Sequence, residues 1–138
     1  MASVVQDAIS KFATLIETAV SGATTLQGTI DPININTNEL PHFQLFAGEL
    51  VDTEQLPWRQ YRQNITFSVI GTVKDQTQEQ MWTIYDLIET RVRNSDARLS
   101  LTVLWCRITA SAVDDHPAKG NEYQTLLFFV ECEVIRVG

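Results

Sequence analysis

Apolar side chains recur at steps of three and four residues through the first part of the chain. The set is Val5, Ala8, Ile9, Phe12, Leu15, Ile16 and Ala19. Charged Lys11 and Glu17 lie off the face that these side chains share, which is typical of an amphipathic helix. We predict that this helix begins after Ser3, a suitable N-cap, and ends at Ser21-Gly22.

The middle of the chain changes from strand periodicity to helix periodicity near residue 75. Between Gln63 and Val73 apolar and polar residues alternate, which predicts a strand. Apolar residues then return at helical spacing, and we predict a helix over Gln76–Asn94 that Asp75 caps. The apolar stripe of this helix consists of Met81, Ile84, Tyr85, Ile88 and Val92, widened by Trp82 and Leu87.

The last part of the chain predicts two long strands joined by a polar turn at Asp114–Gly120. The second strand, Tyr123–Val137, alternates far beyond the usual five or six residues, and its even-numbered residues look like core. The first strand, Leu101–Ala112, places these residues on one face: Thr102, Leu104, Cys106, Ile108 and Ala110.

The odd-numbered face of the second strand begins apolar, with Leu127 and Phe129, and becomes acidic at Glu131 and Glu133. We therefore expect the sheet to project beyond the helices that cover it, with Glu131 and Glu133 on the projecting face. A long exposed strand pairs readily with another chain. This pattern indicates oligomerisation.

Between Thr24 and Trp58 the pattern is mixed, and turn-prone residues interrupt it. We predict a strand within Phe43–Leu50, clearest at His42–Phe46, and a loop from Glu49 to about Trp58. Long loops in compact domains are usually functional or disordered. Trp58 is either an exposed interface anchor or a locally packed aromatic. The candidate contacts with a neighbouring subunit or ring are Asp52, Glu54, Leu56 and Trp58.

The length of 138 residues fits a single domain, 1–138. The elements predict an α+β fold: a mixed, mainly antiparallel sheet flanked by two main helices, with a long C-terminal β-hairpin. The net charge of −7 argues against a nucleic-acid grip, which needs clustered basic residues, although an acidic channel wall would let DNA pass. We expect no signal peptide and no membrane span.

Side chains capable of chemistry are few and scattered. Cys106 and Cys132 become cross-strand neighbours in a hairpin centred near residue 119, either as small buried hydrophobes or as a disulfide or metal pair. His42 and His116 are expected in surface loops. The sequence contains no nucleotide-binding, nucleophile-elbow or zinc-protease motif. We predict no catalytic residues, no metal site and no cofactor.

The order of the elements resembles one protein family. A Leu-Pro dipeptide leads into a short strand at Leu40–Phe46, and polar residues lead into the strand at Arg62–Val69. With an N-terminal helix, a second helix and a C-terminal hairpin, this layout resembles the tail terminator, or tail-completion, proteins of long-tailed bacteriophages, the minor tail protein U group. The similarity spans nearly the whole chain and rests on layout.

The resemblance implies a structural virion protein and not an enzyme. It would assemble in the host cytoplasm as a hexameric ring at the head-proximal end of the tail. Such a ring caps the tail tube, stops its polymerisation and presents a surface for the head connector, while DNA passes through the lumen without specific binding. The implied partners are further copies of the chain, the tail tube protein and the connector or neck protein, and no membrane.

Two alternatives remain open. A head–tail joining (neck) protein would share the fold and the size. From a different class, a small cytosolic enzyme or ligand-binding module would use His42, His116 and Asp114-Asp115. An enzyme predicts a monomer or dimer with a closed pocket, whereas a terminator predicts a ring with a hole.

Overall fold

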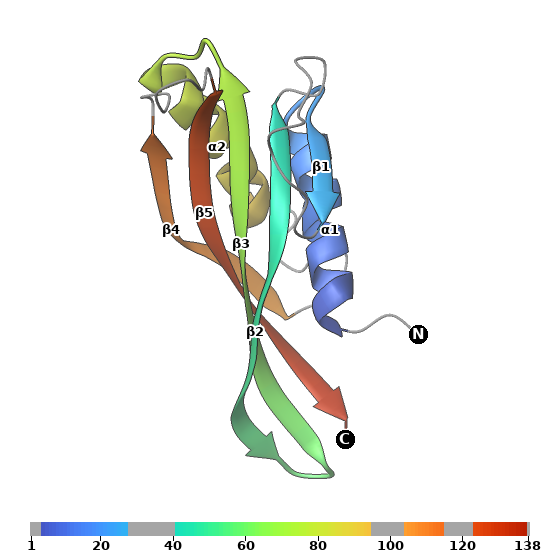
Figure 1. Cartoon of the computed structure of the whole chain (residues 1–138). Helices are drawn as coiled ribbons and strands as arrows, with labels where there is room; N and C mark the ends of the chain where they lie inside the picture. Colours follow the sequence, from blue (N-terminus) through green and yellow to red (C-terminus); the bar gives the residue numbers. More distant parts are fainter. Residues whose placement is uncertain (1–3, 28–40, 95–103, 115–122, 138) are drawn as a thin grey trace.

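The computed structural model describes residues 4–27, 41–94, 104–114 and 123–137. These residues form two helices and five strands (Figure 1). In chain order the elements are α1 (Val4–Ala19), β1 (Thr24–Gln27), β2 (His42–Leu56), β3 (Gln60–Lys74), α2 (Gln78–Asn94), β4 (Trp105–Asp114) and β5 (Tyr123–Val137).

The strands form one sheet in the order β1-β2-β3-β5-β4. β1 runs parallel to β2, and all other neighbours are antiparallel, so the sheet is mixed and mainly antiparallel. β4 and β5 form the long C-terminal hairpin. The predicted α+β fold class is therefore confirmed.

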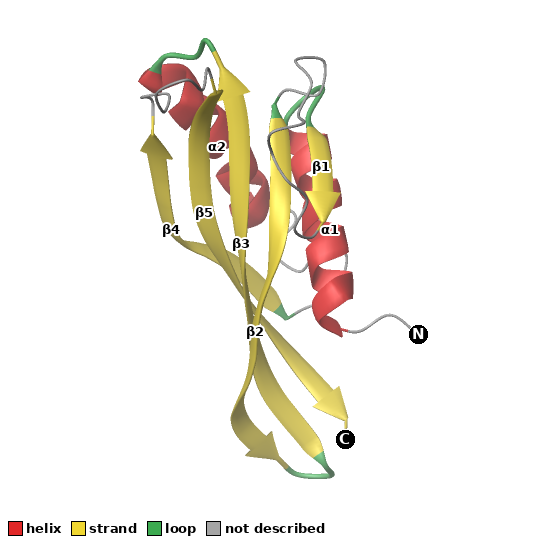
Figure 2. Cartoon of the chain, viewed as in Figure 1, coloured by secondary structure: helices red, strands yellow, loops and turns green. Residues whose placement is uncertain are grey.

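Both helices cover the same face of the sheet and lie behind it in Figure 2. Phe128 on β5 joins the two halves of the core, because its ring lies 6.2 Å from that of Phe12 on α1 and 6.0 Å from that of Tyr85 on α2. Phe12 also meets Phe67 of β3 edge to face at 5.5 Å. These aromatic contacts add to the hydrophobic burial that holds the helices on the sheet.

Several predicted elements are confirmed. α1 ends at Ala19, and Gly22 follows with a φ of 79°, a left-handed conformation that glycine adopts without strain. β5 has the full predicted length, and its even-numbered residues are buried: Leu126, Phe128, Val130, Cys132 and Val134. Alternation over a long strand is a strong signal because one face must meet the core.

The start of the second helix was predicted too early. α2 begins at Gln78, and Thr77 caps it in a capping box with Gln80. The Gln80 N–H donates to Thr77 Oγ1 (3.1 Å), and the Thr77 N–H donates to Gln80 Oε1 (2.8 Å). Asp75 instead has a φ of 56° in the preceding turn. Leu87, expected to widen the apolar stripe, is exposed.

The face predicted for the first C-terminal strand holds only for part of its length. Cys106 is buried and Ile108 packs against the core, but a bulge between Ile108 and Ala110 shifts the register. A bulge adds one residue to a strand and so exchanges its two faces. As a result Ala110 is exposed, and Val113 packs against the core instead. Residues 101–103 and His116 lie outside the described residues.

The largest correction concerns the loop predicted from Glu49 to Trp58. β2 continues to Leu56, so Asp52, Glu54 and Leu56 lie on a strand that pairs with β3. Neither face of this segment meets the core, so its sequence lacks the alternation of apolar and polar residues that predicts a strand. For this reason the sequence pattern indicates a loop. His42, expected in a surface loop, is buried in the first position of β2. Within the described residues no helix is both long and apolar enough to cross a bilayer.

Candidate interaction surface

The lower part of β2 and β3 forms an arm that extends beyond both helices (Figure 1). We define the arm as Glu49–Leu56 of β2, the turn Pro57–Arg59 and Gln60–Asn64 of β3. The end of β5 pairs along it as far as Gln60 opposite Val137. At about 3.3 Å per residue, the arm is roughly 20–25 Å long.

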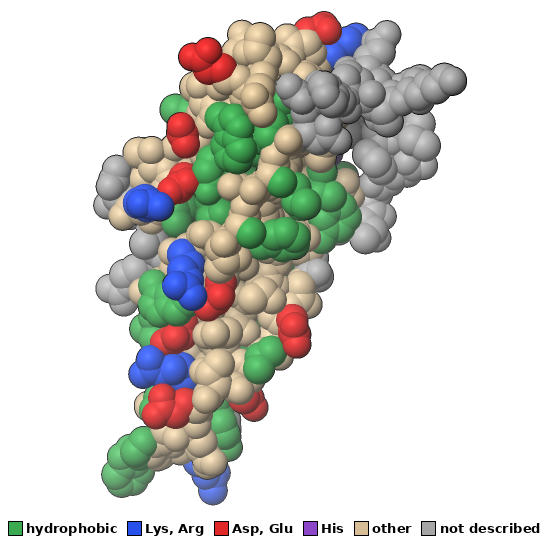
Figure 3. All heavy atoms as spheres, turned by 90° about the vertical axis from the view of Figure 1, so that its left-hand side faces the viewer, with side chains coloured by type: hydrophobic (Ala, Val, Ile, Leu, Met, Phe, Trp, Pro, Cys, Tyr) green, Lys and Arg blue, Asp and Glu red, His purple; other side chains and the backbone are tan. Residues whose placement is uncertain are grey.

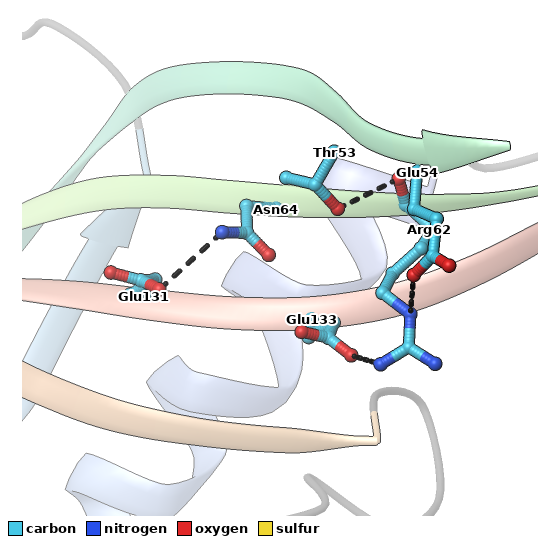
Figure 4. Close-up of polar contacts among 6 residues, drawn as sticks. All are labelled: Thr53, Glu54, Arg62, Asn64, Glu131 and Glu133. Atoms are coloured by element: carbon cyan, nitrogen blue, oxygen red, sulfur yellow. Dashed lines mark hydrogen bonds and ion pairs between the residues drawn. The ribbon is translucent and has the colours of Figure 1, made fainter.

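Arg62 on the arm lies between β2 and the end of β5 (Figure 4). Its Nη1 donates to Glu133 Oε1 on β5 at 2.7 Å, and its Nε lies 3.5 Å from Glu54 Oε2 on β2. Thr53 Oγ1 also donates to the Arg62 carbonyl at 3.1 Å. The main-chain ladders hold the strands of the arm side by side. Since the arm has little apolar core, these charge-assisted side-chain contacts are what reinforces them.

A second polar group lies nearer the body of the protein. Asn64 Nδ2 donates to Glu131 Oε1 at 3.4 Å (Figure 4). Arg107 Nη2 of β4 donates to the same oxygen, also at 3.4 Å. The Arg107 guanidinium also lies 5.2 Å from the centre of the Trp105 ring, a cation–π contact. This group links β3, β5 and β4 at the base of the arm.

Glu131 and Glu133 do lie on the face of β5 that continues toward the arm, as the alternation predicts. Their charges are paired, however, and their side chains are only 20% and 12% exposed. The sequence showed the acidic residues but not the arginines that pair with them from neighbouring strands, since it does not reveal which strands are neighbours. Arg62 and Arg107 are therefore the residues of this surface that sequence reasoning missed.

Two bulges shape β2, one between Phe46 and Glu49 and one between Asp52 and Glu54. At the first, a Cβ on Gly48 would lie 1.5 Å from the carbonyl oxygen of Thr66. Only glycine fits this close backbone approach. Bulges increase the twist of a strand and bend it, so this one sits where the arm leaves the body.

The turn at the tip of the arm presents a tryptophan to solvent. Trp58 and Arg59 have φ angles of 65° and 59°, and the Trp58 side chain is 90% exposed. For residues with a side chain, this left-handed backbone costs roughly 1–2 kcal/mol each. Such strain persists where the surrounding structure enforces it, and it is common at functional sites.

Other exposed apolar side chains accompany Trp58 along the arm. Leu50 and Val51 lie on β2, and Ile135 lies opposite Arg62 on β5. With Trp58 they are the majority of the exposed large hydrophobic residues in the described part of the chain. Exposed apolar side chains that gather on one projection are typical of an interaction surface.

The two cysteines lie opposite each other in the β4–β5 pairing, as their spacing predicts. Both are buried free thiols. A hydrogen bond with Cys106 and burial raise the pKa of the Cys132 thiol well above its ordinary value. A neutral buried thiol is a poor nucleophile, so the pair behaves as small hydrophobes. No group of three or more metal-ligating side chains occurs among the described residues.

The predicted contact residues Asp52, Glu54, Leu56 and Trp58 thus lie on one element, the arm, although as strand and turn residues. Arg62 connects Glu54 on the arm to Glu133, whereas Glu131 is held by Asn64 and Arg107 at the base of the arm. No protein-family model matches the chain, and no curated protein matches its sequence.

Proposed function

We propose that the chain is the subunit of a hexameric ring that caps a bacteriophage tail tube. In this proposal the ring stops polymerisation of the tube, receives the head connector and lets DNA pass through its lumen. The layout that resembles tail terminator proteins supports the proposal, and so does the α+β architecture that this family implies.

The observation that carries the proposal is the arm. It extends the sheet past both helices, and its exposed apolar side chains end in Trp58 at the tip. An isolated hairpin gains little stability of its own, so an arm held by polar contacts serves best when another subunit or ring covers it. Tryptophan and arginine, the residue types at its tip, are the commonest interface hot spots.

The net charge of the chain supports the proposal that DNA passes through the ring. A ring of subunits that each carry −7 repels phosphate groups and does not retain DNA. Each subunit contact should bury roughly 800 Å² per partner, the size of a standard stable interface.

Tube termination is the direct test of this function. Tail tube protein of the same phage polymerises with and without the purified chain, and electron microscopy gives the length distribution and the density at the tube end. The proposal expects short tubes with a ring at one end. Unchanged tubes together with binding to purified connector would indicate a neck protein, and binding to neither would contradict both assembly roles.

A further inference from the structure

The outer face of the sheet, which neither helix covers, carries an apolar area near its centre. Across the strands, Phe46, Ser68, Phe129 and Ala110 are successive register partners. The next row away from the arm contains Ile70, Leu127 and Ala112. We call the following residues the outer patch: Phe46, Ile70, Ala110, Ala112, Leu127 and Phe129.

The outer patch is accessible. Phe129 is 45% exposed, and Ala110 and Ala112 are exposed on the edge strand β4. Figure 3 shows apolar side chains gathered on the body of the protein above a band of acidic and basic groups. At the lower end of the same view, an apolar group and a basic group lie at the tip of the arm.

The tip cannot reach the outer patch of its own chain. Along β3, Gln60 at the tip and Ser68 in the patch are separated by about 26 Å at 3.3 Å per residue. The ladder with β5 is continuous over this distance, so the arm cannot fold back without breaking it. The two apolar features are therefore available only to another molecule.

The charges beside the two features are complementary. Arg59 stands next to Trp58 at the tip and makes no ion pair within the described part of the chain. Glu49 lies opposite Thr66, in the row next to that of Phe46, on the same outer face. It too has no ion pair among the described residues. The tip therefore carries an apolar side chain beside a positive charge, and the outer patch is an apolar area beside a negative charge.

We propose that Trp58 of one copy packs on the outer patch of a second copy and that Arg59 of the first pairs with Glu49 of the second. The left-handed turn fixes both side chains outward before contact, which lowers the entropy lost on binding. Because the tip and the patch are different surfaces, the contact is head-to-tail and leads to a ring if the rotation closes. It rests on the proposed ring and specifies one of its contacts.

Charge reversal separates this contact from unspecific association. Sedimentation equilibrium measures self-association of the wild type, Arg59→Glu, Glu49→Arg and the double variant in low salt. We expect each single reversal to weaken association three- to tenfold, and the double variant to recover most of it. Asp86→Arg, an exposed change on α2 with the charge change of Glu49→Arg, is the control and should leave association unchanged.

The apolar half of the contact has its own pair of variants. Trp58→Ala should weaken association about tenfold or more. Leu87→Ala removes an exposed apolar side chain from α2 and should have no effect. Circular dichroism and thermal unfolding check that each variant is folded.

The outcomes distinguish the contact from the function. If rings persist unchanged in Trp58→Ala and in the single reversals, the contact is wrong and the ring stands. If the double variant associates more weakly than both single variants, Arg59 and Glu49 do not pair and the contact as proposed is overturned. If the wild type stays monomeric at every concentration, the contact is also wrong. The tube-length experiment described above then tests the proposed function independently.

Discussion

The guanidinium of Arg62 on β3 lies 2.7 Å from the carboxylate of Glu133 on β5. Arg62 and Glu133 are 71 positions apart in the sequence. Their contact links β3 of the arm to β5, within the longest unbroken pairing of the sheet. The Glu133 side chain is nearly buried, so removing its partner leaves a carboxylate with little access to water. The projecting arm therefore depends on a polar contact more than on a hydrophobic core.

Arg62→Met should lower the free energy of unfolding by about 1–2 kcal/mol, because it leaves Glu133 without its counter-charge. Urea denaturation measures the change. Arg93→Met removes the i,i+4 pair with Glu89, in which the arginine side chain is well exposed, and should cost less than about 0.5 kcal/mol. The double variant Arg62→Met with Glu133→Gln should be more stable than Arg62→Met alone. Equal losses in the two arginine variants would contradict this role for Arg62.

Gly48→Ala should be among the most damaging single-methyl additions to the chain. The new Cβ meets backbone atoms of β3, which cannot move aside as a flexible side chain can, so we expect a loss of about 3 kcal/mol or more. Gly22→Ala places its Cβ in open space and suffers only from the positive φ, about 1 kcal/mol. Thermal unfolding of both variants separates steric clash from backbone strain. A mild effect at Gly48 would mean that the first bulge is not held as described.

Thr77→Ala should cost about 1 kcal/mol of stability, because two N–H groups at the start of α2 lose their side-chain partners or the geometry that holds them. Thr83→Ala, within the same helix and exposed, should be neutral or slightly stabilising because alanine is the better helix former. Chemical denaturation of the pair provides the measurement. If Asp75→Ala cost more than Thr77→Ala, the cap would be assigned to the wrong residue.

The raised pKa of Cys132 predicts a loss of stability in alkali. The folded protein keeps the thiol proton to a higher pH than the unfolded chain, whose thiol has the ordinary value of 9.0. The unfolded state therefore binds fewer protons, and the free energy of unfolding falls as the pH rises above about 9. Denaturation curves from pH 7 to 10.5 should show this slope in the wild type and a smaller one in Cys132→Ala. Identical slopes would exclude Cys132 as the cause.

The sequence predicted those elements that have a buried face. α1, β3 and β5 each place apolar residues at the period of their own structure, so their existence and the core positions of β5 followed directly. The lower half of β2 has no buried face, and two bulges further interrupt its alternation. A strand of this kind has no signal in the sequence, since its pairing with β3 comes from main-chain hydrogen bonds that any residue can make.

The candidate site was predicted in part for the same reason. Trp58 stood out because it follows Leu56-Pro57 in a segment predicted as a loop, and its side chain is indeed exposed. The partners of Glu131 and Glu133 remained hidden because they depend on strand order. β3 lies between β2 and β5, and this order brings Arg62 to Glu54 on one side and Glu133 on the other. Glu131 meets Arg107 because β4 is the other neighbour of β5.

The mass of the wild-type protein in solution, with negative-stain images of the same fractions, tests the central claim most directly. The account predicts particles of about six subunits with a central opening, or a monomer that converts to such rings as its concentration rises. A protein that remains monomeric at all concentrations and leaves growing tail tubes uncapped would contradict it.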